Sequence, residues 1–105
     1  MNMRTHTTAR TTILGCDEAT VVYTRALDRV SVALQHLPAT TLDTLLHGRS
    51  TRRHLTDADH AALRSYQRTV QRIQRAGHGD LIDDQLDGFL SAVHADRTFR
   101  LPWAA

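Results

Sequence analysis

Along most of this chain, hydrophobic residues recur every three or four positions, which is the spacing of amphipathic helices. The segment 55–76 shows it most clearly, because its apolar residues fall on one arc of a helical wheel and its arginines fall on the opposite side. Thr56 followed by Asp59 has the spacing of a capping box, and Gly77 can adopt the left-handed conformation that closes a helix. A long helix is therefore predicted here. Its apolar positions are Leu55, Ala62, Leu63, Tyr66, Val70 and Ile73, opposite Arg64, Arg68, Arg72 and Arg75.

Another long helix is predicted earlier in the chain, between Gly15 and Leu37. Asp17 and Glu18 follow Gly15 closely, and acidic residues near a helix start complement its positive end. Pro38 is expected to end the helix, because the residue before a proline is disfavoured in the helical region. The arc that this helix would bury consists of Val22, Tyr23, Ala26, Leu27, Val30, Ala33, Leu34 and Leu37.

A short helix and a third long helix complete the pattern. Thr40 with Asp43 has a second capping-box spacing, and Gly48 is placed to end a helix of two turns. Asp80 and Asp83 repeat the capping pattern at the start of the last long helix. The apolar positions are Leu42, Leu45 and Leu46 in the short helix and Ile82, Leu86, Phe89, Leu90 and Val93 in the long one.

These segments predict an all-α fold, a small bundle of three long amphipathic helices and one short helix. A chain of 105 residues supports one domain. Residues 1–14 are expected to form a flexible arm, residues 15–97 the single helical domain, and residues 98–105 a C-terminal tail. The tail is too apolar to be an ordinary solvated end, so we expect it to pack back or to dock elsewhere. Its apolar residues are Phe99, Leu101, Pro102 and Trp103.

Charge is distributed in blocks, although the net charge is only +2. The segment 49–75 carries seven arginines and two aspartates, whereas the segment 80–96 carries five aspartates and no arginine. The basic block suits nucleic acid, an acidic partner or the acidic segment of its own chain. The lone Cys16 excludes an internal disulfide, and the absence of a long apolar run predicts a soluble, cytoplasmic protein without a membrane partner.

The segment 32–48 places a short turn before a short helix, and Gly48 and several arginines follow it. It resembles the helix-turn-helix of repressor-like DNA-binding domains, over about residues 32–53. The resemblance implies duplex DNA as the partner, with base contacts from the short helix and phosphate contacts from the arginines. Asp43 is a departure, because its carboxylate would repel phosphate. The implied base contacts are Thr40, Thr41, Thr44 and His47, and the phosphate contacts are Arg49, Arg52 and Arg53, extended by Arg64 and Arg68.

Two other interpretations stay open for the same residues. The segment 32–48 also fits an ordinary helical corner that binds nothing. The chain also fits a protein-interaction module, an oligomeric adaptor or inhibitor, in which the arginine face of one copy meets Asp83, Asp84 and Asp87 of another. Exposed ion pairs contribute little, so such an interface would need an apolar anchor. The residues available for it are Phe99, Leu101 and Trp103.

Enzymatic chemistry has no clear sequence signal. The chain has seven histidines, but no H-E-x-x-H pair, and His54 and His60 lie on different faces of any helix that contains both. Gly77 and Gly79 have no neighbouring lysine, which argues against a phosphate-binding loop. The sequence therefore predicts a non-enzymatic binding protein without metal or cofactor, most simply a DNA-binding regulator.

Overall fold

The computed structural model describes the backbone of residues 14–104 and the side chains of residues 14–96. In this range it contains helices and no strand, which confirms the predicted all-α class. Most of the predicted arm and the side chains of Phe99, Leu101 and Trp103 lie outside the described residues. The helices are α2 (Cys16–Ala33), α3 (Ala39–Leu46), α4 (Asp57–Arg75) and α5 (Gly79–Ala104).

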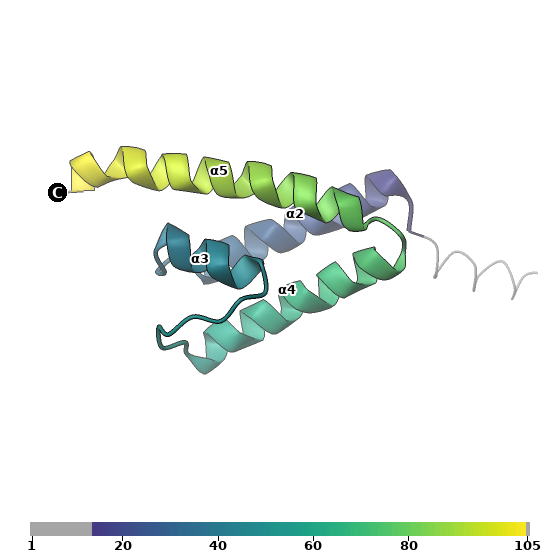
Figure 1. The fold of residues 1–105 in the computed structure, drawn as a ribbon, viewed down its shortest axis with the longest axis horizontal. Helices are drawn as coiled ribbons and strands as arrows, with labels where there is room; N and C mark the ends of the chain where they lie inside the picture. Colours follow the sequence, from purple (N-terminus) through teal and green to yellow (C-terminus); the bar gives the residue numbers. More distant parts are fainter. Residues whose placement is uncertain (1–13, 105) are drawn as a thin grey trace, which may run out of the picture.

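The three long helices pack together, and the short one lies across one side of them (Figure 1). The most extensive helix–helix contact is between α2 and α4, and α5 touches both. Helix α3 packs mainly on α5. In Figure 1, α2 lies behind α3, which occupies the near side of the molecule.

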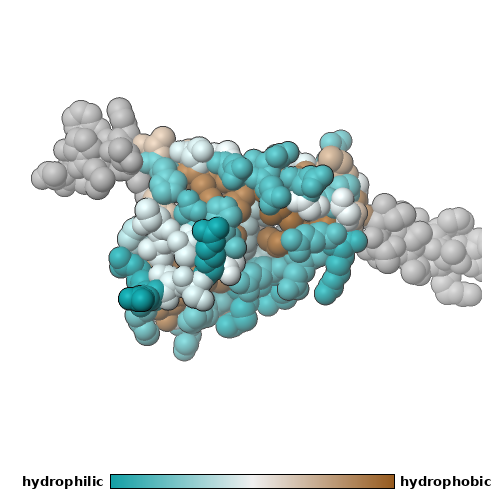
Figure 2. All heavy atoms as spheres, in the orientation of Figure 1, coloured by the Kyte–Doolittle hydropathy of each residue, from teal (hydrophilic) through white to brown (hydrophobic). Residues whose placement is uncertain are grey.

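A hollow of about 340 Å³ lies on the near side, where α3, α4 and α5 meet. Its apolar lining includes Val70, Ile82 and Leu86, and Gln67 and Gln71 lie along its α4 side. Figure 2 shows hydrophobic residues along the middle of this face, between hydrophilic residues of the surrounding helices. The helices therefore leave part of their apolar surface open on this side.

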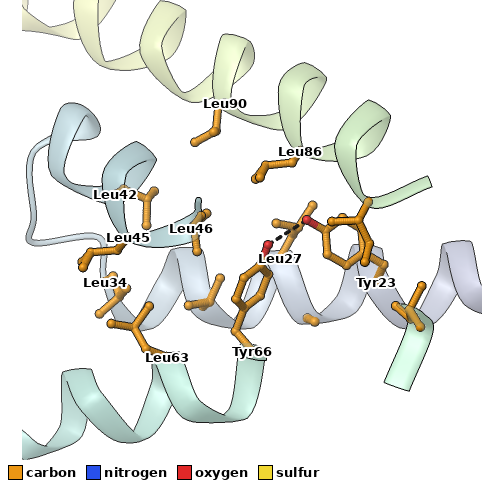
Figure 3. Close-up of a cluster of buried hydrophobic side chains, with 14 of the residues drawn as sticks. Tyr23, Leu27, Leu34, Leu42, Leu45, Leu46, Leu63, Tyr66, Leu86 and Leu90 are labelled. Carbon is orange, nitrogen blue, oxygen red and sulfur yellow. Dashed lines mark hydrogen bonds between the residues drawn. The ribbon is translucent and has the colours of Figure 1, made fainter. Parts of the chain in front are cut away.

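The core draws side chains from every helix (Figure 3). Its largest fully buried side chains are Tyr23, Leu34, Leu42 and Ile73. The hydroxyl groups of Tyr23 and Tyr66 share a buried hydrogen bond of 2.8 Å between α2 and α4. Burial raises the pKa of both tyrosines above the usual value of about 10. The α2–α4 contact thus contains one pair of buried hydroxyl groups that are hydrogen-bonded to each other, among apolar side chains.

The ends of α4 are where the sequence predicts them. The backbone N–H of Asp59 donates to Thr56 Oγ1 at 3.1 Å, and the N–H of Thr56 donates to Asp59 Oδ2 at 3.0 Å, so the predicted capping box is confirmed. At the other end, Gly77 has a φ of 88°, and the N–H of His78 donates to the Ile73 carbonyl at 3.1 Å. These bonds satisfy groups that a helix end leaves unpaired.

The first helix ends before its predicted stop at Pro38, because α2 already stops at Ala33. Pro38 has no N–H to donate to the Leu34 carbonyl, which would be its partner in a continued helix. The N–H of Leu37 donates to that carbonyl instead, at 3.0 Å, and closes a tighter turn. Leu34 and Leu37 are both still buried, so the turn keeps their predicted packing.

The predicted capping roles of Thr40 and Asp43 are wrong. Helix α3 begins at Ala39, and Pro38 precedes it without a side-chain capping bond, so Thr40 lies inside the first turn. Proline fits next to a helix start, because its missing N–H would have no partner there. Asp80 is likewise inside α5, which begins one residue earlier at Gly79.

Candidate nucleic-acid interface

Helix α3 is fixed to the bundle by its leucines. Leu42 is fully buried, and Leu45 and Leu46 are nearly so. In Figure 3 they lie between the buried side chains of α4 and those of α5. This orientation matches the prediction that α3 packs through its leucines, and it determines which α3 residues face solvent.

The four candidate base contacts differ in exposure. Thr40 and His47 are exposed, whereas Thr41 and Thr44 are half-buried. The Thr44 hydroxyl donates to the Thr40 carbonyl at 3.0 Å, so its proton is used within the helix. Thr40 and His47 are therefore the most accessible of the set.

The loop that leaves α3 turns sharply at Gly48 and then exposes three arginines. Gly48 has a φ of 79°, and the Arg49 N–H donates to the Thr44 carbonyl at 3.0 Å, so Gly48 ends the helix as predicted. Arg49, Arg52 and Arg53 are all exposed. None of them forms an ion pair with a described residue. Their charge is therefore available for an external anion.

Asp43 lies beside this surface, in contact with two histidines. His47 Nδ1 is 2.8 Å from Asp43 Oδ1, and His94 Nε2 of α5 is 3.2 Å from Asp43 Oδ2. The contact with His94 joins α3 to α5. Sequence reasoning recognised Asp43 as a repulsive charge but missed both partners, and no sequence signal links position 43 to position 94.

The arginines of α4 are exposed on the side away from the core, as their spacing predicts. Within the described chain, Arg64 and Arg68 form no ion pair, and neither do the exposed Asp83, Asp84 and Asp87 of α5. The arginine and aspartate faces thus do not neutralise each other inside one copy. Arg64 and Arg68 lie on α4, the helix that follows the loop.

A second histidine–aspartate contact supports the corner between α2 and α3. His36 Nε2 is 3.2 Å from Asp59 Oδ1, and Asp59 is only 4% exposed. The backbone N–H of Thr56 and the side chain of His36 lower the pKa of Asp59. The sequence identified Asp59 as a cap but missed His36, because the contact depends on how the turn folds over α4.

The candidate protein-interface residues belong to the last part of α5. Helix α5 continues through Ala104, so the backbone of the predicted tail is helical up to that residue. The side chains of Phe99, Leu101 and Trp103 lie outside the described residues.

In the part of the chain that the structure describes, no group of three or more histidine, cysteine or acidic residues is arranged to hold a metal ion. No helix there is long and apolar enough to cross a membrane. Comparisons with protein-family models, with curated proteins and with solved structures found no match to this chain.

Proposed function

We propose that this protein binds duplex DNA through α3 and the loop that follows it. The observation that carries the proposal is the set of three exposed arginines without ion pairs, directly after the exposed end of α3. Arg49, Arg52 and Arg53 contact phosphates, which supplies affinity and fixes the register of the protein on the duplex.

Thr40 and His47 are the base contacts in this proposal, because Thr40 is exposed on α3 and His47 is exposed directly after its last residue. A threonine hydroxyl or an imidazole can exchange hydrogen bonds with base edges in the major groove, which is wide enough to admit a helix. The three leucines on the opposite face keep α3 in place.

The test is a fluorescence-anisotropy titration of the full chain on labelled duplex DNA, repeated over a range of salt concentrations. Each phosphate neutralised contributes roughly 0.9 to the slope of log affinity against log salt. Replacing Arg49, Arg52 and Arg53 together with alanine should therefore reduce the slope by up to about 2.7. A protein that shows no association at low salt would contradict the proposal.

A matched control removes three arginines elsewhere. Arg29 on α2 and Arg72 and Arg75 near the end of α4 are exposed and lie outside the proposed surface. Their combined replacement with alanine changes the net charge equally, so it separates a local contact from general attraction. Equal loss of slope in both triple variants would show that the binding is not localised at the loop.

Sequence preference provides the second test. Selection from a random duplex pool should enrich different sequences for wild type and for His47→Ala, while the salt slope stays nearly unchanged. An unchanged preference would remove His47 from the base contacts without affecting the phosphate contacts.

A further inference from the structure

One side of α2 faces solvent and carries an unusual stripe of residues. Val21 and Val32 are the large hydrophobic residues that stand exposed in the described chain, at 49% and 65%. Arg25 and Asp28 lie between them, both exposed and both without an ion pair to a described residue. The spacing i, i+4, i+7 and i+11 places all four on one line about 16 Å long.

This stripe is complementary to itself when two copies of α2 run in opposite directions. Val21 and Val32 lie equally far from the midpoint between Arg25 and Asp28. One two-fold axis through that midpoint therefore pairs Val21 with Val32 of the second copy and Arg25 with Asp28 of the second copy. The same axis generates both contacts again. In a parallel arrangement, each arginine would face an arginine and each aspartate an aspartate. The charges therefore favour the antiparallel arrangement.

The seam between α2 and α5 provides room for the arginine of a second copy. A hollow of about 310 Å³ beside the stripe is lined by Asp28 of α2 and by Asp84 and Gly88 of α5. Asp28 and Asp84 give this hollow a negative charge. In the antiparallel arrangement, Arg25 of the second copy comes to Asp28 and gains a second carboxylate nearby.

The same seam contains a second hollow at the other end of the stripe. It has a volume of about 410 Å³, and its lining combines apolar side chains, among them Val32 of α2 and Phe89 and Val93 of α5, with the polar Ser31, Gln35 and Asp96. In the antiparallel arrangement, Val21 of the second copy meets Val32 at this hollow. Apolar contact and charge thus agree on one direction and one register.

We propose that this face of α2, with the adjoining seam of α5, is the interface for a second copy of the chain. None of the four stripe residues belongs to α3 or to the loop that follows it. The proposal concerns a different surface from the DNA contact, and its test uses no DNA, so either proposal can fail alone.

The first experiment measures the dissociation constant of the dimer of this chain by sedimentation over a concentration series. Arg25→Asp and Asp28→Arg each place like charges opposite each other twice per dimer, which should raise the constant by about tenfold or more. The double variant Arg25→Asp, Asp28→Arg restores opposite charges and should recover dimerisation. A wild-type chain that stays monomeric, or a double variant as weak as the single ones, overturns the proposal.

The second experiment tests direction by disulfide trapping in a Cys16→Ser background, which removes the one native thiol. A chain carrying Val21→Cys and Val32→Cys should oxidise to a covalent dimer. The two thiols cannot pair within one chain, because a disulfide needs Cα atoms within about 7 Å and these are about 16 Å apart. Val32→Cys alone should not be trapped. Equal trapping of that single variant would contradict the antiparallel register.

Discussion

Helices α2 and α4 bury side chains against each other along much of their length, whereas α3 is joined to the bundle by three leucines and one histidine–aspartate contact at the surface. The α2–α4 contact also contains the buried tyrosine pair, and α4 has a complete cap at its start. Segments with fewer buried contacts open more readily. We therefore expect the element that carries the proposed DNA surface to be the less stable of the two regions.

The largest effect is expected from emptying the α2–α4 core. Ile73 of α4 is fully buried, so Ile73→Ala should lower the free energy of unfolding by about 2–5 kcal/mol, measured by urea denaturation. Ser65→Ala, at an exposed position of the same helix, is the control and should change it by less than about 0.5 kcal/mol.

Leu42→Ala tests whether α3 is less stable than the α2–α4 pair, because Leu42 is as deeply buried as Ile73 but belongs to α3. Its loss should speed amide hydrogen exchange in α3 while α4 stays protected. Equal loss of protection in both helices would show that α3 and the α2–α4 pair open as one unit.

The next largest loss of unfolding free energy is expected from changing the buried tyrosine pair. Tyr23→Phe leaves the Tyr66 hydroxyl buried without a partner, which should cost about 1–3 kcal/mol of unfolding free energy. Replacing both tyrosines with phenylalanine removes the unpaired group and should cost less than the two single changes added together. Additive costs would show that the hydroxyls do not depend on each other.

Alkaline titration tests the same pair without mutation. Burial raises both pKa values, so the tyrosines of the unfolded chain lose their protons at a lower pH than those of the folded chain. The contribution of the pair to folding stability is therefore complete below about pH 10 and is lost as the pH rises further. The chain has only these two tyrosines, so tyrosinate absorbance reports on them alone. We expect it to appear together with loss of helical circular dichroism. Tyrosinate formed near pH 10 in a fully helical protein would contradict this.

Signals that act within a few residues were predictable from the sequence, and contacts between distant segments were not. The cap of Thr56 with Asp59 and the glycines after α3 and α4 depend on local geometry, and the structure has them as predicted. The early end of α2 and the start of α3 were misjudged, although Pro38 was recognised. Because Pro38 has no N–H, the Leu34 carbonyl one turn earlier has no donor in a continued helix, and Pro38 itself occupies the capping position of α3.

The candidate site shows the same division. Helical periodicity was enough to predict that the leucines of α3 are buried and that the arginines of α4 are exposed. The partners of Asp43 and Asp59 were missed, because His94 and His36 reach them only after the helices have packed. The spacing of residues along one helix does not determine which side chain of another helix will lie opposite.

The smallest expected effect concerns the contact that joins α3 to α5. His94 and Asp43 are both about 38% exposed, and exposed pairs contribute about 0–1 kcal/mol, so His94→Gln should barely change global unfolding. Amide exchange should nevertheless rise in α3 and not in α4, since the contact between Asp43 and His94 does not involve α4. His47→Gln is the matched control, because His47 contacts the same carboxylate without reaching another helix. If both variants raise exchange in α3 equally, the imidazoles act on the charge of Asp43, and α3 is held to α5 by its leucines alone.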